Sequence, residues 1–267
     1  MIASETRISY YGMRYVRIPF LIFKDRAGGN MLLEDTLLRG FEKLNISADA
    51  RAMERFRVYY EYLEEKNAVM NLTAISGEKD VAELHFLDSA ALLNMLPGLE
   101  GKSVVDVGTG AGFPGLVLKI LCPKVKLTLL DSLDKRIAFL RECCEKLGFE
   151  DVNCVHARAE EAPKEFRESF DIAVSRAVAR LNVLSELCVP FVRPSGTFAA
   201  MKGPDCAGET AEAKNAVAAL GGRIERTELY TIPGTEVSHA AVIIKKTGVT
   251  AGKYPRRWAQ IKKAPLL

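Results

Sequence analysis

From residue 99 onward, short apolar runs alternate with stretches of helical periodicity, and this alternation constrains the fold more than any other feature. Apolar runs bounded by glycine, proline or charged residues are typical of buried strands. The predicted strands cover residues 103–107, 125–130, 152–155, 171–174, 196–201, 223–230 and 237–245. The predicted helices between them cover residues 115–121, 134–147 and 181–191. Strands and helices in alternation form a doubly wound sheet, so we predict an α/β fold with a mostly parallel, seven-stranded sheet.

The chain before this region has a different texture. Apolar residues recur every three or four positions between residues 32 and 96, beginning with Leu33 and Leu37. We therefore predict a helical lead-in over residues 31–98, followed by the α/β core over residues 99–248. Residues 1–30 match neither a helical nor a strand pattern, and whether this N-terminal extension belongs to the native protein stays open.

Composition excludes several classes of protein. The chain has 267 residues, 48% of them hydrophobic, so it can bury a sizeable core. Its apolar runs are far shorter than the roughly 20 residues that a membrane helix needs, and we expect neither a membrane span nor a signal peptide. The 6 cysteines include no C-x-x-C pair, which favours reduced thiols and a cytoplasmic location. The 3 histidines lie far apart and none pairs with cysteines at zinc spacing, so we expect no metal.

Positive charge gathers at the C terminus. The net charge is only +3, but the chain from residue 245 onward carries lysines and arginines without a single acid. Cations and aromatic rings are interleaved there, at Lys253, Tyr254, Arg256, Arg257 and Trp258. Such a pattern suits phosphate neutralisation with stacking on exposed bases, and the alternative is a solvated basic terminus. We predict that residues 249–267 form a basic C-terminal tail, and that removing residues 253–267 weakens RNA binding but leaves the melting temperature unchanged.

A glycine-rich loop directly follows the first predicted strand. The segment from Asp106 to Gly115 reads DVGTGAGFPG. Glycines let the backbone approach a ligand closely at the carboxyl edge of a sheet, where doubly wound folds bind small molecules. Gly110, Gly112 and Gly115 match the dinucleotide fingerprint, and Asp131 ends the second strand, where a carboxylate can bind ribose hydroxyls. The loop and Asp131 therefore suit either NAD or S-adenosylmethionine.

Asp106 separates these two cofactors. The form D-x-G-x-G-x-G is typical of methyltransferases, and a pyrophosphate site gains nothing from a carboxylate at this position. S-adenosylmethionine has no phosphate and carries a cationic amino acid end. We therefore predict S-adenosylmethionine as the cofactor, with an NAD-dependent oxidoreductase and a purely structural turn as the alternatives.

Five sequence blocks, in a fixed order along the chain, match one known family. They are residues 71–73 with 85–89, 106–115, 129–133 with 135–136, 175–177, and 201–203. On these blocks the chain resembles the small-subunit ribosomal RNA guanine-N7 methyltransferases, also called glucose-inhibited division protein B. The resemblance covers about residue 31 to the C terminus. It implies the class I S-adenosylmethionine-dependent methyltransferase fold and methylation of guanine N7 in 16S ribosomal RNA.

The glycine loop and the resemblance together suggest roles for single residues. The cofactor-binding residues expected in this way are Asp106, Gly108, Gly110, Gly112, Phe113, Asp131, Ser132, Ala159, Glu160 and Arg176. The expected substrate-binding residues are Asn71, His85, Lys202, Lys253, Arg256 and Arg257. Three alternatives stay open: Glu160 solvates a loop, His85 is a structural histidine, and Arg176 pairs with Asp171 or another acid.

The chemistry of the acceptor also favours guanine N7. Attack by an exocyclic amine usually involves a polar residue and prolines after the fourth strand, and cytosine C5 methylation needs a reactive cysteine; this chain has neither arrangement. Guanine N7 has a lone pair and no proton to lose, so the enzyme needs only to place it in line with the methyl group. Arg176 can bond two acceptors in one plane, and we predict it as the catalytic residue.

We therefore predict a monomeric enzyme that acts on small-subunit ribosomal RNA, either free or within the ribosomal particle. Besides the NAD-dependent oxidoreductase, two rivals remain. One is a methyltransferase for a small molecule or a protein, in which the basic tail is accidental. The other is a non-enzymatic RNA-binding module with a vestigial cofactor pocket.

Overall fold

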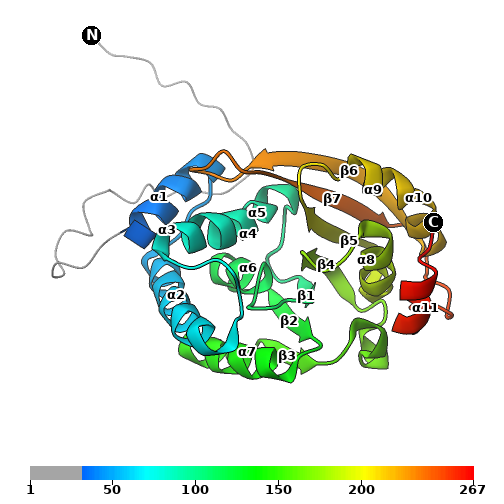
Figure 1. Cartoon of the computed structure of the whole chain (residues 1–267), viewed down its shortest axis with the longest axis horizontal. Helices are drawn as coiled ribbons and strands as arrows, with labels where there is room; N and C mark the ends of the chain where they lie inside the picture. The colour runs from blue at the N-terminus through cyan, green and yellow to red at the C-terminus, as the bar shows by residue number, and fades with distance from the viewer. Residues whose placement is uncertain (1–31) are drawn as a thin grey trace, which may run out of the picture. The chain divides into compact units, whose positions relative to one another are not determined.

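A seven-stranded sheet organises the chain (Figure 1). The structure is a computed structural model that describes residues 32–267, so the predicted extension of residues 1–30 lies outside the described residues. The strands are β1 (Ser103–Val107), β2 (Lys126–Asp131), β3 (Asn153–His156), β4 (Phe170–Arg176), β5 (Val192–Lys202), β6 (Gly222–Thr231) and β7 (Ser238–Lys246). Their order is β3-β2-β1-β4-β5-β7-β6, with β1 to β5 parallel and β7 antiparallel to both of its neighbours. The predicted fold class is confirmed.

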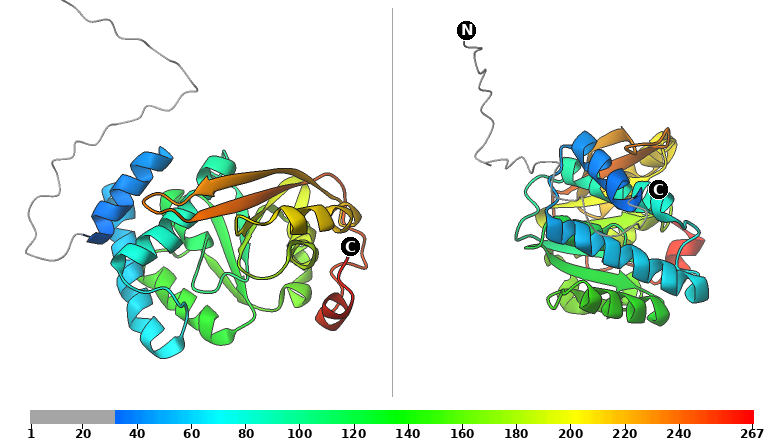
Figure 2. Two further views of the ribbon diagram at one scale, coloured as in Figure 1. Left: turned by 45° about the horizontal axis from the view of Figure 1, so that its top comes forward. Right: turned by 90° about the vertical axis from the view of Figure 1, so that its left-hand side faces the viewer.

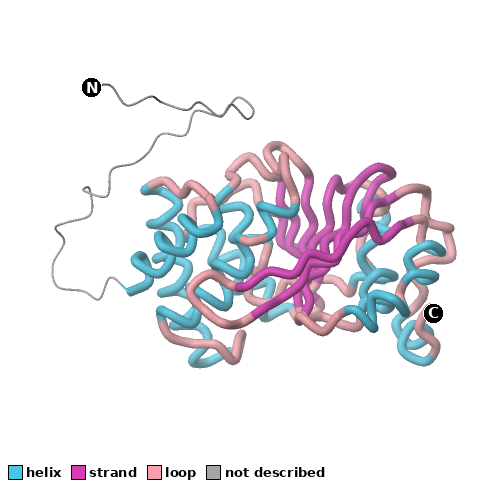
Figure 3. Tube along the Cα trace, turned by 90° about the horizontal axis from the view of Figure 1, so that it is seen from above, coloured by secondary structure: helices cyan, strands magenta, loops and turns pink. Residues whose placement is uncertain are grey.

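Alternate residues of the strands point to opposite faces of the sheet, and each face has its own core. Val104, Ile172 and Val174 belong to one buried cluster, while Val105 and Ala173 belong to the other. Helices α6 (Gly115–Leu121) and α7 (Asp134–Lys146) cover the first face, and α8 (Leu181–Cys188) and α10 (Lys214–Ala219) cover the second. Figure 3 shows the strands between these two groups of helices. Among the described residues, no helix is long and apolar enough to cross a bilayer.

The predicted lead-in is helical and shares the first-face core (Figure 2). It contains α1 (Leu32–Leu44), α2 (Ala50–Met70), α3 (Glu78–Val81), a π-helical stretch (Ala82–Leu87), α4 (Asp88–Ala90) and α5 (Leu92–Met95). Asp49 caps α2, because its side chain accepts a hydrogen bond from the Ala52 N–H at 2.7 Å. Leu33, Leu37 and Phe41 of α1 are buried in the same cluster as the sheet residues, so the lead-in is packed into the fold.

The C-terminal tail is packed into the fold, which argues against the prediction that removing residues 253–267 leaves the melting temperature unchanged. It forms a short helix, α11 (Trp258–Lys263), that apolar periodicity did not reveal. Tyr254 and Ile261 are buried in the second-face core. The Arg167 guanidinium donates hydrogen bonds to the backbone carbonyls of three tail residues, among them Thr250 and Tyr254. The side chains of Lys253, Arg257, Lys262 and Lys263 are nevertheless exposed to solvent, as the alternative of a solvated basic terminus has them.

The predicted boundaries differ from the observed ones chiefly where the sequence is poor in large apolar residues. Helices α9 (Ala207–Glu212) and α10 were not predicted, because alanine and charged residues dominate both. Strand β5 begins at Val192, before the predicted start at residue 196, because it passes through exposed residues before it enters the core.

Candidate active site

The glycine loop joins β1 to α6 at the carboxyl edge of the sheet. Gly108, Gly110 and Gly112 have φ angles of +69°, +61° and +106°, a region that favours glycine. A Cβ on Gly108 would lie 2.5 Å from the Val178 side chain, and one on Gly112 would lie 2.5 Å from the Tyr59 hydroxyl. A Cβ on Gly110 would meet no atom of the described residues within 4 Å, its two chain neighbours aside. Gly108 and Gly112 therefore serve close packing, whereas Gly110 borders open space.

Asp106 ties the two ends of this loop together. Its side chain is 0% exposed, and its Oδ2 accepts hydrogen bonds from the Thr109 hydroxyl at 2.7 Å and the Gly115 N–H at 2.8 Å. Its Oδ1 is buried and has no hydrogen-bond partner in the described part of the chain. Burial raises the pKa of Asp106 to about 6. A cationic ligand group would relieve the cost of this buried, half-satisfied carboxylate.

Asp131 holds the middle of the loop from the end of β2. Its Oδ2 accepts a hydrogen bond from the Gly110 N–H at 2.9 Å and contacts the Arg136 guanidinium at 3.3 Å. Its Oδ1 accepts the Leu133 N–H at 3.0 Å. Each carboxylate oxygen can accept more than one hydrogen bond, so ribose hydroxyls can still bind there. Ser132 follows on the surface, at the same edge.

The turn after β3 brings a third carboxylate to this edge. Asp131 and His156 are partners in the β2–β3 register, and the 3-10 turn Ala159–Glu161 begins three residues later. Ala159 packs against the second-face core. The Glu160 Oε1 is buried and has no hydrogen-bond partner among residues 32–267. This burial contradicts the alternative in which Glu160 only solvates a loop.

These features fit S-adenosylmethionine. Two buried carboxylate oxygens without partners, on Asp106 and Glu160, match donors of the cationic amino acid end and the adenine or ribose. Open space at Gly110 leaves room for a ligand against the backbone. A phosphate would meet only like charge from Asp106, which disfavours a dinucleotide.

A second group of side chains surrounds Arg176 at the end of β4. The Arg176 Nη1 donates to the Asp88 carboxylate at 2.9 Å and to the Leu84 carbonyl at 3.2 Å. Its Nη2 lies 3.0 Å from the His85 Nδ1, and the guanidinium carbon lies 5.0 Å from the centre of the Phe113 ring. The ion pair that stood as the alternative for Arg176 therefore exists, and its acid is Asp88.

Asp171, the acid named in that alternative, is engaged at the opposite end of β4. It accepts hydrogen bonds from the Ser103 N–H and hydroxyl, both at 2.9 Å, and pairs with Arg193. Parallel strands place the first residues of β1 and β4 at the amino edge of the sheet, so Asp171 cannot reach Arg176 at the carboxyl edge.

His85 is enclosed by its neighbours. Because Arg176 can only donate, the His85 Nδ1 must accept, and the proton sits on Nε2, which lies 2.8 Å from the Thr73 hydroxyl. The ring stacks on Phe113 with centroids 4.4 Å apart and is 7% exposed. Burial, followed by the charge of Arg176, lowers the pKa of His85 to about 3. The structural alternative describes His85 better than a role in substrate binding does.

Asp88 connects Arg176 to strands β6 and β7, at one end of the sheet. It is fully buried, and its Oδ1 accepts hydrogen bonds from the Tyr230 hydroxyl and the His239 Nδ1, both at 2.8 Å. Burial alone would raise the pKa of Asp88, but the hydrogen bond from His239 and the charge of Arg176 outweigh it and hold the pKa below its usual value. Tyr230 and His239 were not identified from the sequence. The one signal that pointed toward them was Asp88, an acid within an apolar helical stretch of the lead-in.

Two of the expected substrate-binding cations are engaged within the chain. The Lys202 ammonium donates to the Ala179 carbonyl at 2.6 Å and to Glu209 at 3.0 Å. Arg256 forms a bidentate pair with the fully buried Glu186, at 2.8 Å and 2.7 Å. These contacts contradict the predicted substrate role of both side chains, because a phosphate would have to displace a buried or partly buried acid.

The other expected substrate residues lie on the surface. Asn71 ends α2 in a left-handed conformation, with φ +50°, and is exposed. Arg257 is exposed at the start of α11, and Lys253 is exposed with its ammonium 5.1 Å from the centre of the Tyr254 ring. These three side chains remain accessible to a partner.

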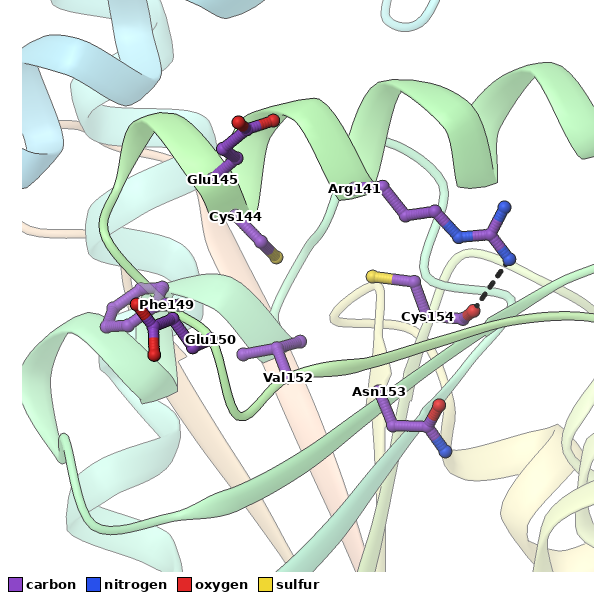
Figure 4. A pocket seen from close by; sticks show the side chains of 8 residues that line it. All are labelled: Arg141, Cys144, Glu145, Phe149, Glu150, Val152, Asn153 and Cys154. Atoms are coloured by element: carbon purple, nitrogen blue, oxygen red, sulfur yellow. Dashed lines mark hydrogen bonds between the residues drawn. The ribbon is translucent and has the colours of Figure 1, made fainter.

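A surface hollow lies apart from this site, between α7 and β3 (Figure 4). Its volume is about 530 Å³, and its lining residues are Arg141, Cys144, Glu145, Phe149, Glu150, Val152, Asn153 and Cys154. None of them belongs to the glycine loop or the Arg176 cluster, so this hollow is not the cofactor site. Within residues 32–267, no three histidine, cysteine or acidic side chains lie close enough together to hold a metal ion.

Comparisons with known proteins agree with this geometry. The family model GidB, described as rRNA small subunit methyltransferase G, matches residues 52–233. The ribosomal RNA small subunit methyltransferase G of Clostridium kluyveri is 45% identical over 225 residues, which cover 84% of this chain and 94% of that protein. The protein of the same name from Alkaliphilus metalliredigens is 44% identical over 238 residues, covering 88% and 98%.

A solved structure supports the fold alone. The methyltransferase in a complex with the Haloferax volcanii Trm112 methyltransferase activator aligns with a TM-score of 0.51 at 15% identity, covering 61% of this chain and 90% of that chain. The family match extends over most of the described residues and includes both the glycine loop and Arg176. The chain therefore belongs to the rRNA small subunit methyltransferase G family.

Proposed function

We propose that this enzyme transfers a methyl group from S-adenosylmethionine to N7 of a guanine in small-subunit (16S) ribosomal RNA. As a member of its family, the chain is an S-adenosylmethionine-dependent methyltransferase. The observation that carries the proposal is a pair of carboxylates, Asp106 and Asp131, which accept hydrogen bonds from the backbone of a glycine loop at the carboxyl edge of the sheet. The oxidoreductase and the vestigial-pocket alternatives fit neither the family nor this donor set.

The residues that would hold the cofactor lie on three neighbouring strand ends. Asp131 accepts the ribose hydroxyls, and Asp106 and Glu160 use their partnerless oxygens for its remaining donors. Gly110 supplies the space that any side chain would fill. We also place three residues beside the bound cofactor: Phe113, Ser132 and Ala159. When bound, S-adenosylmethionine supplies an activated methyl group on a sulfonium.

Arg176 is the proposed catalytic residue. A guanidinium has five N–H donors, and the contacts to Leu84, Asp88 and His85 use three of them. The Nε–H and one Nη2–H have no partner among the described residues, and the side chain keeps 16% of its surface exposed. Two donors in one plane suit a guanine O6 or the carboxylate of the cofactor. Because N7 has no proton to lose, orientation is all that the acceptor needs.

The role of Arg176 has its own test. Arg176→Ala should lower the rate of methyl transfer more than it lowers RNA affinity, because one cation among many contributes little to binding, while an orienting contact acts on the transition state. Single-turnover rates and RNA titrations on the same protein measure both. An equal fall in rate and affinity would reassign Arg176 to general phosphate binding.

The division of the chain is part of the proposal. Residues 99–248 hold the cofactor, while residues 31–98 and 249–267 present surfaces to the RNA. Exposed cations of the tail, including Arg257 and Lys262, support its part. We place the enzyme in the cytoplasm as a monomer, where it meets the RNA free or within the ribosomal particle; the 6 free cysteines suit a reducing compartment.

The decisive experiment maps N7-methylguanine in 16S ribosomal RNA from cells with and without the gene. One methylated guanine should disappear with the gene and return with the wild-type copy, but not with a Gly110→Val copy. Identical maps would overturn the proposal. Transfer of tritiated methyl groups from S-adenosylmethionine into small molecules or protein, instead of RNA, would favour the other methyltransferase reading.

A further inference from the structure

The hairpin of β6 and β7 reaches across the sheet edge to the Arg176 cluster. Tyr230 of β6 and His239 of β7 are partners in the strand register, and their rings are perpendicular with centroids 6.2 Å apart. Both donate a hydrogen bond to the same oxygen, Oδ1 of Asp88. Figures 1 and 2 show the tip of this hairpin beside the lead-in helices that carry Asp88.

Asp88 divides its two oxygens between the hairpin and Arg176. Its Oδ2 accepts the Arg176 Nη1, and its Oδ1 accepts Tyr230 and His239. The carboxylate is fully buried, so it depends on these three donors to stay ionised. If the two donors on Oδ1 are lost, the carboxylate must rotate or take up a proton, and either change moves its bond with Arg176.

The hairpin itself is firmly held against the lead-in. The Ile232 side chain is fully buried in the first-face core, and the Arg226 Nη2 donates to the Met95 carbonyl at 2.8 Å. A Cβ on Gly234, at the hairpin tip, would lie 2.7 Å from the Glu83 carboxylate, so the tip fits directly against the π-helical stretch. A hairpin fixed in this way can act as a rigid anchor.

The other side of Arg176 faces the glycine loop. Its guanidinium lies over the ring of Phe113, which belongs to the loop, and His85 stacks on the same ring. The hairpin, through Asp88, and the loop, through Phe113, therefore fix the guanidinium from two directions. This leaves its Nε–H and one Nη2–H in a single defined plane.

We propose that Tyr230 and His239 are positioning residues, which act through Asp88 to hold the Arg176 guanidinium in the orientation needed for methyl transfer. The proposal rests on the proposed function, in which Arg176 orients the acceptor or the cofactor. The competing account is that the Tyr230–Asp88–His239 cluster only stabilises the fold.

The anchor can be measured without methyl transfer. The hydrogen bond between His239 and Asp88 raises the pKa of His239 above its usual value, although burial and the charge of Arg176 oppose this shift. Asp88, Arg176 and Tyr230 are the charged or titratable groups that contact it or act on it. In the cofactor-free enzyme, an NMR titration should show the pKa of His239 falling in Asp88→Asn and rising in Arg176→Ala. No change in either variant would overturn the coupling.

The kinetic test compares Tyr230→Phe, His239→Leu and the double variant. With both donors removed, we expect the single-turnover rate at saturating S-adenosylmethionine to fall by about 10- to 100-fold, as for a displaced orienting group. His239→Asn keeps an N–H donor close to the original Nδ1 and should restore most of the rate. Tyr62→Phe is the matched control, because it removes a tyrosine bond to Glu142 outside the site and should leave the rate unchanged.

Melting curves accompany each variant. A folded double variant whose single-turnover rate stays within about twofold of wild type would overturn the proposal. The assay can decide this, because the expected tenfold fall in rate corresponds to about 1.4 kcal/mol of activation free energy. A rate that falls only with the folded fraction, and that His239→Asn does not restore, would also overturn it in favour of a structural role. A wild-type enzyme that methylates no RNA would instead refute the proposed function, and the NMR titration would still decide whether the anchor exists.

Discussion

The glycine-loop edge and the Arg176 cluster are built in opposite ways. In the loop, Asp106 bonds residues 3 and 9 positions away, and Asp131 bonds a residue 21 positions away. In the cluster, Asp88 bonds Arg176, Tyr230 and His239, which lie 88, 142 and 151 positions away. The first site is assembled by one strand-turn-helix unit and its neighbour, whereas the second needs the lead-in, β4 and the terminal hairpin together.

The two regions also differ in how well their polar groups are satisfied. The loop edge keeps buried oxygens of Asp106 and Glu160 without partners in the described chain. In the cluster, both oxygens of Asp88 and both ring nitrogens of His85 have partners. At the loop edge, a bound cofactor would complete these carboxylate oxygens, whereas in the cluster the fold completes Asp88 and His85 and, among residues 32–267, leaves two N–H groups of Arg176 for a ligand. Three predictions test the loop edge, and one compares two arginines of the C-terminal tail.

The largest effect is expected at Gly110. Gly110→Val should abolish measurable S-adenosylhomocysteine binding, because the side chain would occupy the open space beside the loop and also strain a backbone with φ +61°. The protein should stay folded, since among residues 32–267 no atom beyond the two neighbouring residues lies within 4 Å of the new Cβ. Calorimetry measures the binding and a melting curve measures the fold.

The neighbouring Gly112 is the matched control. Gly112→Val would place its Cβ 2.5 Å from the Tyr59 hydroxyl and 2.6 Å from the Leu116 side chain, so it should lose stability before it loses a ligand contact. Normal binding by Gly110→Val would mean that the loop is only a turn. Equal destabilisation by both substitutions would remove the distinction between packing glycines and ligand glycines.

The same contrast explains which parts of the site could be predicted from the sequence. The seven strands, the helices α6, α7 and α8, and the roles of Asp106 and Asp131 were predictable, because local periodicity and a short motif specify them. Tyr230 and His239 were not, because their meeting with Asp88 depends on the register of an antiparallel hairpin. Lys202 and Arg256 were misassigned for a similar reason: their partners, Glu209 and Glu186, could not be paired with them from spacing.

The second prediction uses two adjacent arginines of the tail. Arg256→Gln should lower the free energy of unfolding by about 3 kcal/mol, because it leaves the fully buried Glu186 without its cation. Arg257→Gln should leave stability unchanged and weaken RNA binding, with a log–log salt slope smaller by about 0.7 for a single strand. Urea unfolding and salt titrations measure these. If Arg257 proves the more important for stability, the tail is not anchored as the structure has it.

The third prediction concerns Asp131. Asp131→Ala should weaken S-adenosylhomocysteine binding by about 1.5 to 3 kcal/mol, since it removes a charged acceptor of the ligand and releases the Gly110 N–H. Asp134→Ala is the control, because this nearby carboxylate is exposed and its removal should leave affinity unchanged. Calorimetry at one pH compares the three proteins. Wild-type affinity in Asp131→Ala would exclude the ribose role.

The smallest effect is expected from pH and follows from the unsatisfied oxygen of Asp106. Its pKa is about 6 in the folded, ligand-free protein and near 3.8 in the unfolded chain, so the folded state holds the extra proton between these values. This group therefore favours the ligand-free fold more as the pH falls through that range, and it disfavours the fold once ionised.

A ligand with a cationic end selects the ionised carboxylate of Asp106, so ligand binding must release the proton below pH 6. We expect S-adenosylhomocysteine affinity to fall about tenfold between pH 7 and pH 5, the change that one pH unit below the pKa gives. Calorimetry in buffers of different ionisation enthalpy would count the released proton, and Asp106→Asn, which cannot ionise, should bind weakly with no release. The hydrogen bond to Asp88, outside the loop, raises the pKa of His239 above its usual value, so a proton still released by Asp106→Asn would assign the pH dependence to the Arg176 cluster instead of the loop edge.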